Sequence, residues 1–103
     1  MGREVDALQV VAEPRRREIL HLVWDRELAA GAIAARFDVS FAAVSQHLGV
    51  LRDAGFVSVR RVGRSRLYRA DRRALGPLRS TLEKMWTSSL DRLVTLVEED
   101  EGG

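Results

Sequence analysis

One part of the sequence, residues 56–70, alternates between apolar and polar side chains in the way that β-strands do. Its two alternating runs, residues 56–62 and 66–70, are separated by Gly63-Arg64-Ser65, and Gly63 can adopt the positive φ angle of a tight turn. The segment is therefore predicted to form a β-hairpin. A hairpin alone is at best marginally stable in water, so it must pack against other elements. We expect a mainly α-helical fold that carries one small β-hairpin.

The rest of the chain carries apolar residues at the three- and four-residue spacing of amphipathic helices. Pro14 favours the first position of a helix, and Ser40 is a good N-cap because its hydroxyl can accept a hydrogen bond from a free backbone N–H. Gly55 supplies the usual stop signal after a helix. The four helices predicted before the hairpin span residues 4–12, 14–25, 29–37 and 41–54.

A longer helix is predicted after the hairpin, over residues 77–99. At 1.5 Å per residue it would be about 35 Å long, which is more than a body of this size can cover. Its apolar stripe therefore needs a partner, most simply the same helix of a second copy of the chain. Trp86 fits such a dimer core better than a ligand site, because indole rings are usually buried. The interface residues expected on this helix are Leu78, Leu82, Met85, Trp86, Leu90 and Leu93.

The positive charge of the chain is concentrated in one segment. The net charge is only +2, but residues 52–73 carry eight arginines against Asp53 and Asp71. Such a cluster is typical of a surface that binds a polyanion. The alternative is a solvated strand edge, because charges also protect edges from aggregation. The phosphate or minor-groove contacts expected at the end of the hairpin are Arg60, Arg61, Arg64, Ser65 and Arg66, with Arg64 and Arg66 the strongest candidates.

The helix predicted at residues 41–54 has two distinct faces. One face, with Val44, Leu48 and Leu51, should pack inward. The opposite face carries small or hydrogen-bonding side chains, of which Gln46 can form a bidentate pair with adenine and Ser45 can reach a base or a phosphate. The DNA contacts predicted from this helix and its cap are Ser40, Ala42, Ala43, Ser45, Gln46 and His47.

Three features keep more than one interpretation open. His47 lies toward the shoulder of the inward face, where it is either partly buried and hydrogen-bonded or in contact with a phosphate. Gly49 costs about 1 kcal/mol in a helix interior, so either DNA or a neighbouring helix comes close to it or the cost is tolerated. The arginines at residues 15–17 form either a solvated surface run or a phosphate contact at a helix start.

Several function classes are not expected for this chain. It has no cysteine, which excludes disulfides, thiol chemistry and cysteine-ligated metals. It has two histidines, so a histidine-rich zinc site within one chain is not expected. No glycine-rich phosphate loop or nucleophile elbow is present, so we expect no enzymatic activity and no cofactor. No signal peptide or membrane-length apolar run is visible, so a cytoplasmic protein without a membrane partner is expected.

Two short helices joined by a tight turn and followed by a basic hairpin form a winged helix-turn-helix. The residues of this chain resemble the ArsR family of winged-helix repressors over residues 5–97. The resemblance is carried by AEPRRREIL at residues 12–20, SFAAVSQHL at 40–48, VLRDAGFV at 50–57 and RRVGRSRLY at 60–68.

A chain of 103 residues suits one domain, and we expect it over residues 1–103, with residues 3–70 as the DNA-binding core with its wing and residues 77–99 as the dimerisation helix. The family resemblance concerns how two such chains associate. It implies a homodimer built from the first and last helices, which adds Val5 and Leu8 to the expected interface. It also implies repression by occupation of an operator and release by a bound signal, either a small molecule or a protein.

The chain departs from the metal-sensing members of that family. Those members carry a cysteine pair after Glu-Leu, whereas Glu27-Leu28 is followed here by Ala29-Ala30-Gly31. Others chelate through Asp and His of the last helix, which here has Asp91 and no histidine. We therefore expect a metal-independent branch that lacks soft and imidazole ligands.

The expected partners are duplex DNA and a second copy of the chain, with two recognition helices about 34 Å apart on an inverted repeat. The alternative is a winged helix used for protein contact, as an adaptor or antirepressor. The arginine-rich hairpin favours DNA as the partner, and so do the small or hydrogen-bonding side chains on the outward face of residues 41–54.

Overall fold

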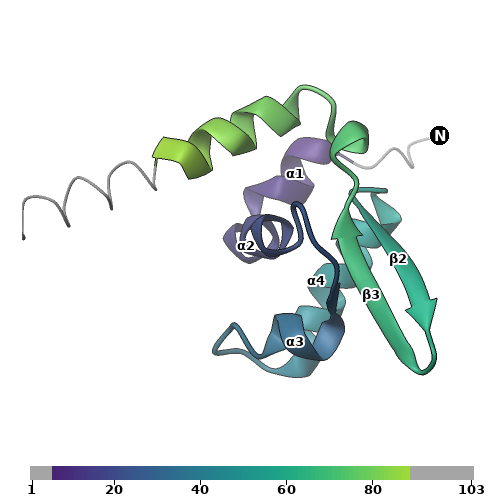
Figure 1. Ribbon diagram of the computed structural model, residues 1–103. Coiled ribbons are helices and arrows are strands. Elements are labelled where there is room, and N and C mark those ends of the chain that lie inside the picture. The colour runs from purple at the N-terminus through teal and green to yellow at the C-terminus, as the bar shows by residue number, and fades with distance from the viewer. Residues whose placement is uncertain (1–5, 89–103) are drawn as a thin grey trace, which may run out of the picture.

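A computed structural model describes residues 6–88 of the chain, and Figure 1 shows its arrangement. Helices form most of the molecule, and a small antiparallel sheet lies along one side of them. No helix within this part of the chain is long and apolar enough to cross a membrane. The elements are α1 (Ala7–Ala12), α2 (Pro14–Leu22), β1 (Leu28–Ala29), α3 (Ala30–Ala34), α4 (Phe41–Asp53), β2 (Val57–Val62), β3 (Ser65–Ala70), the 3-10 helix η1 (Arg72–Leu75) and a C-terminal helix that begins at residue 78 and reaches residue 88.

The hydrophobic core lies between α2, α4 and the base of the sheet. The side chains of Ile19 and Leu20 from α2 are fully buried there. Val44, Leu48 and Leu51 are at most 1% exposed, so the inward face predicted for residues 41–54 is confirmed. Removing any of these aliphatic side chains from the core would cost about 2–5 kcal/mol of stability, which fixes α4 firmly on the body.

Both ends of α4 are set by the residues that the sequence singled out. The Ser40 hydroxyl accepts a hydrogen bond from the backbone N–H of Ala43 at 3.1 Å. At the other end Gly55 takes a φ of 81° and donates its N–H to the carbonyl of Arg52, while the N–H of Phe56 bonds to the carbonyl of Leu51. These two bonds form a Schellman motif, and the chain enters β2 directly from it.

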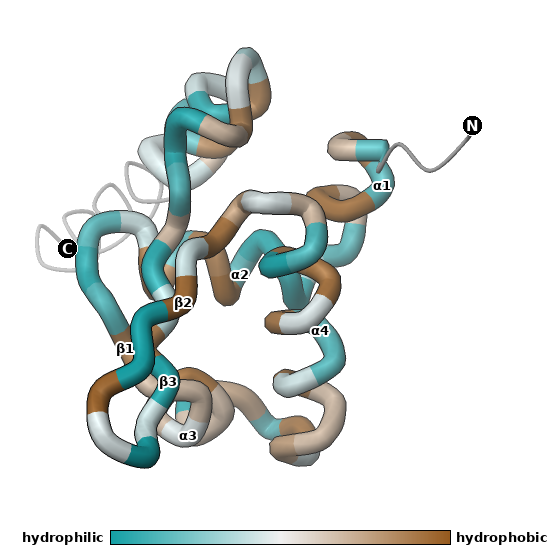
Figure 2. The backbone as a smooth tube through the Cα atoms, turned by 90° about the vertical axis from the view of Figure 1, so that its right-hand side faces the viewer, coloured by the Kyte–Doolittle hydropathy of each residue, from teal (hydrophilic) through white to brown (hydrophobic). Residues whose placement is uncertain are grey.

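The predicted hairpin is the larger part of a three-stranded sheet with the order β1-β3-β2. Val62 pairs with Ser65, so the turn contains only Gly63 and Arg64, and Ser65 belongs to β3. Gly63 has a φ of 60°, which confirms the predicted need for a glycine. We call the β2–β3 hairpin the wing; in Figure 2 hydrophilic residues occupy much of its length.

The strand β1 was not predicted, and it explains why the third helix begins later than expected. Leu28 pairs with Tyr68 and Ala29 with Leu67. Residue 29 is therefore extended, so α3 starts one residue later than predicted. At its other end α3 stops at Ala34 instead of near residue 37. A strand of two residues has no periodicity that a sequence pattern could reveal.

The C-terminal helix is anchored to the body at its beginning. Leu82 is only 2% exposed and belongs to the core of the protomer. Further along, the ring of Trp86 stacks on His21 at 4.4 Å and meets Trp24 edge-on at 4.8 Å. The Trp24 indole N–H donates to Glu83 at 3.1 Å. The expectation that the body leaves this helix largely uncovered is therefore corrected for Leu82 and Trp86, whereas Met85 stays 42% exposed.

Candidate nucleic-acid interface

The outward face of α4 is available for contact with a ligand. The side chains of Ala42, Ser45 and Gln46 are exposed, and that of Ala43 is half-buried. Within residues 6–88 neither Ser45 nor Gln46 has a hydrogen-bond partner for its side chain, and the helix leaves both free to meet a base edge. The structure therefore places Ala42, Ser45 and Gln46 on the exposed side of α4, whereas His47 is half-buried.

A groove of about 370 Å³ separates this helix from the wing. Ser45 lines the side formed by α4, and Arg64, Ser65 and Arg66 line the side formed by the wing. Phe41, the first residue of α4, also lines the groove and is 57% exposed. Phe41 was not among the contacts predicted from the sequence. The available signal was an aromatic residue placed directly after the N-cap, where packing does not require one.

Strand alternation divides the arginines of the wing between two faces. Arg61 lies directly opposite Arg66, and both point to the same side of the sheet as the buried Tyr68. We call this the inner face of the wing, because Tyr68 and Arg66 line the groove beside α4. Like charges directly across a strand pair are destabilising. In the region that the structure describes, no carboxylate forms an ion pair with Arg61, Arg64 or Arg66, so their charge is available to an external anion.

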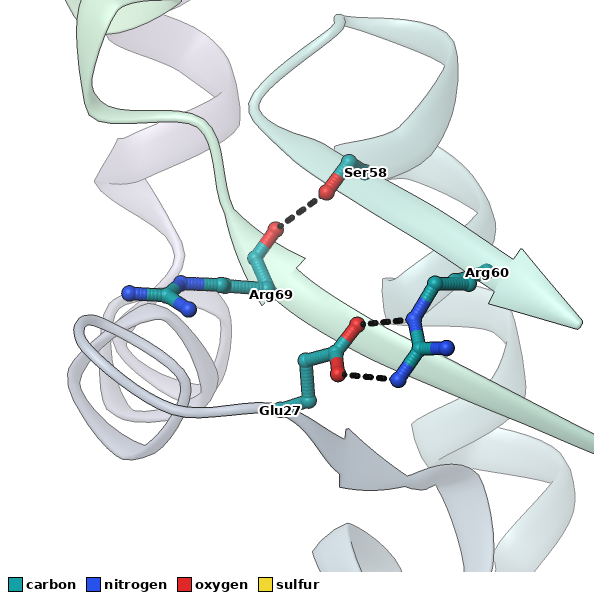
Figure 3. A network of polar contacts seen from close by, with 4 residues as sticks. All are labelled: Glu27, Ser58, Arg60 and Arg69. Carbon is teal, nitrogen blue, oxygen red and sulfur yellow. Dashed lines mark hydrogen bonds and ion pairs between the residues drawn. The ribbon is translucent and has the colours of Figure 1, made fainter. Parts of the chain in front are cut away.

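Arg60 points to the opposite side, the outer face of the wing, and has a partner there (Figure 3). Its guanidinium donates two hydrogen bonds to Glu27, with Nη2 at 2.7 Å from Oε1 and Nε at 3.0 Å from Oε2. These hydrogen bonds lower the pKa of Glu27 below its ordinary value of 4.5, and the same contact raises the pKa of Arg60. Arg69 adds a smaller electrostatic contribution to the lowered pKa of Glu27.

This pairing gives Arg60 a partner within the chain, and the DNA contact predicted for it stays a prediction. A bidentate arginine–carboxylate pair fixes the guanidinium in one geometry, and this one faces away from α4. Glu27 precedes β1, so the ion pair connects the wing to the loop before β1, α3 and α4. Arg60 positions the wing, and Arg61, Arg64 and Arg66 also remain as predicted contacts.

The arginines at the start of α2 have a structural role that neither earlier interpretation included. Arg16 donates to the carbonyls of Gln9 and Val10, at 3.3 and 2.7 Å. Arg17 donates to the carbonyls of Val11 and Ala12, at 2.8 and 2.9 Å. These are the last four carbonyls of α1, which have no acceptor role inside that helix. Arg16 and Arg17 therefore cap α1, and their charge also complements its negative end.

His47 connects this cap to α4. The half-buried imidazole lies with Nδ1 3.5 Å from Nη1 of Arg16. Of the two interpretations for His47, the geometry favours the partly buried, partnered one. Gly49 also lies on α4, and a Cβ atom added there would meet nothing within 4 Å in the described structure. A neighbouring helix within the protomer is therefore not the reason for this glycine.

The comparisons with known proteins agree with this geometry. The family described as "bacterial regulatory protein, arsR family" matches residues 13–59, from the start of α2 into β2. The HTH-type transcriptional regulator Rv2034 of Mycobacterium tuberculosis is 37% identical over 94 residues, which cover 91% of this chain and 88% of that protein. The chain belongs to the ArsR family.

Solved structures extend the match to the fold of this ArsR-family protein. The crystal structure of a possible transcriptional regulator for arsenical resistance is 44% identical and has a TM-score of 0.69, covering 88% of this chain and 95% of that one. A homodimeric winged helix-turn-helix DNA-binding domain from Mycobacterium bovis, described as a possible ArsR-family regulator, is 27% identical with a TM-score of 0.68; 79% of this chain and 75% of that one are covered. The protein is a winged helix-turn-helix transcriptional regulator.

The predicted dimer residues of this ArsR-family chain have different exposures. Leu8 on α1 is 67% exposed and Met85 is 42% exposed, so both side chains are available for contact with a second copy of the chain. Leu78 and Trp86 are half-buried within the protomer. Leu82 is buried in the protomer's own core, so it can support an interface from behind but not form its surface. Three further predicted positions, Val5, Leu90 and Leu93, lie outside the described residues.

Proposed function

We propose that the chain represses transcription as a homodimer that occupies an inverted-repeat operator. One observation carries this proposal: Arg64 and Arg66 of the wing line the same groove as Ser45 of α4. Arg61 lies opposite Arg66 on the same face of the wing, and none of these three arginines has an ion pair within residues 6–88. Phosphate contacts by arginine supply affinity, and side chains on a helix supply base readout. The two requirements for a sequence-specific DNA-binding protein are thus met on one side of the molecule.

The arrangement supports a definite docking geometry. With α4 in the major groove, Gln46 would reach an adenine and Ser45 a base or phosphate. The wing would then cross the neighbouring sugar–phosphate strand with Arg61, Arg64 and Arg66. Two α4 helices about 34 Å apart would read two half-sites, one turn of DNA apart. Polymerase would be excluded from a promoter that carries such a site.

The exposed apolar side chains support the dimer. Leu8 lies on α1 and Met85 on the C-terminal helix, and Figure 1 places both elements at the opposite end of the molecule from the turn of the wing. A twofold axis at that end would leave both wings and both α4 helices free for DNA. The variants Leu8→Asp and Met85→Asp, whose side chains are exposed, should fold but sediment as monomers; a variant that stayed dimeric would remove its residue from the interface.

A DNA-binding regulator of this kind works in the compartment that holds the chromosome, the bacterial cytoplasm, and needs no catalytic site. The signal that releases it would act without thiolate chemistry, because the chain has no cysteine. Neither a membrane nor a cofactor has a role in this proposal.

The decisive test is a titration of nonspecific duplex DNA over a series of salt concentrations. Three arginines per chain give six phosphate contacts per dimer, so the log–log slope should be about −5. Arg64→Ala should reduce the steepness of that slope, whereas Arg69→Ala, on the outer face, should not. A chain that binds no duplex at low salt would overturn the proposal and favour the adaptor function.

A further inference from the structure

We propose that the groove between α4 and the wing holds one thymidine nucleotide of each half-site, with Phe41 against the C5 methyl of the thymine. This inference rests on the proposed DNA-binding function and names the ligand at its most enclosed point. It also assigns a specificity role to Phe41, which was not among the contacts predicted from the sequence.

The two sides of the groove have different chemistry. On the side of α3 and α4 the lining residues are small or apolar apart from the hydroxyl of Ser45: Ala29, Ala30, Gly31, Phe41 and Ser45. The buried Tyr68 of β3 also lines the groove. The rim toward the wing is cationic and hydroxylic, with Arg64, Ser65 and Arg66. A nucleotide has the same division, since its phosphate is anionic and its base and sugar offer apolar edges.

The position of the groove matches the course of a DNA strand. α4 would lie in the major groove and the wing beyond the adjoining backbone, so the sugar–phosphate strand that separates the two grooves must pass between them. Arg64 and Arg66 would then face its phosphates, and Phe41 would face the major-groove edge of a base. Thymine is the one base that presents a methyl group on that edge.

The exposure of Phe41 has no explanation within the protomer. It is 57% exposed at the first position of α4, where a polar residue would suit the helix better. The N-terminal residues of a recognition helix are those that contact base edges. Apolar contact with the thymine methyl, for which phenylalanine is suited, would bury this ring only in the complex.

The experiment uses the full-length dimer and duplexes selected by it from a random pool. In the selected operator each thymine is replaced in turn by uracil, which removes the C5 methyl and nothing else. For the unmodified protein, uracil at one symmetric pair of positions should weaken binding by about fourfold per half-site, the effect of one buried methyl. For Phe41→Ala the same replacement should have no effect, and Phe41→Leu should restore part of the sensitivity.

The matched control is Val39→Ala, an exposed aliphatic side chain in the turn before α4 that does not line the groove. It should keep the full response to uracil. Circular dichroism and sedimentation check that each variant is folded and dimeric. If all variants bind duplex DNA and respond equally to uracil, the assignment of Phe41 is overturned while the proposed function stands. Loss of binding to every duplex by the unmodified protein would overturn the proposed function and this inference together.

Discussion

The inner and outer faces of the wing contain the same residue type in different environments. On the inner face Arg61 and Arg66 lie opposite each other without a carboxylate partner in the described structure. On the outer face Arg60 is held by Glu27, and Arg69 contributes to the same electrostatic environment. One step along a strand separates an arginine without an ion pair in the described residues from one that forms an ion pair, since successive side chains point to opposite faces.

We expect that removal of arginines lowers the affinity for DNA on the inner face of the wing only. The triple variant R61A/R64A/R66A should lose about a hundredfold or more in affinity for any duplex at moderate salt, because it removes six phosphate contacts from the dimer. The matched variant R60A/R69A removes two arginines per chain from the outer face and should lose less than about threefold. Fluorescence anisotropy measures these affinities. Similar losses of affinity per arginine on both faces would show that the two faces do not differ in DNA binding.

A substitution on α4 separates base readout from phosphate contact. Gln46→Ala should cost roughly 1–3 kcal/mol on the selected operator and relax the preference at one base position. The salt slope should stay unchanged, because glutamine neutralises no phosphate. An equal loss on operator and nonspecific duplex would show that Gln46 does not read sequence.

Gly49→Ala tests how closely DNA approaches the outward face of α4. The added methyl meets nothing within 4 Å, so it should raise the free energy of unfolding by roughly 0.5–1 kcal/mol, the usual gain of alanine over glycine in a helix. Urea denaturation measures this gain. Unchanged operator affinity in the same variant would mean that DNA does not come close to this position.

The smallest effect is expected from the pair on the outer face. Because Arg60 lowers the pKa of Glu27, the pair contributes stability above the unfolded value near 4.5, and this contribution is lost as the pH falls through the lowered pKa. The melting temperature of wild type should exceed that of Glu27→Gln slightly at pH 7, and the difference should vanish below the lowered pKa. A difference that persisted in acid would indicate that the carboxylate charge is not what matters.

The sequence predicted the elements whose signals are local. Ser40 and Gly55 set the ends of α4, and Gly63 marked the turn of the wing. The inward face of α4 followed from helical spacing. These features depend on residues within a few positions of each other, which is the range over which sequence patterns carry information.

The features that were missed depend on contacts between distant residues. Glu27 and Arg60 are 33 residues apart, and their pairing required the position of β1, a strand too short to predict. The capping of α1 by Arg16 and Arg17 required the angle between two helices. The division of the wing arginines was within reach, because strand alternation alone separates Arg60 from Arg61 and Arg66 once the register is known.

The guanidinium of Arg16 has a mechanical consequence. It closes the end of α1 and lies 3.5 Å from His47 on α4, so a single side chain joins the helix of the proposed dimer face to the helix proposed to read DNA. Replacement of Arg16 would therefore leave the carbonyls of Gln9 and Val10 without this donor and remove the link between the two helices at the same time.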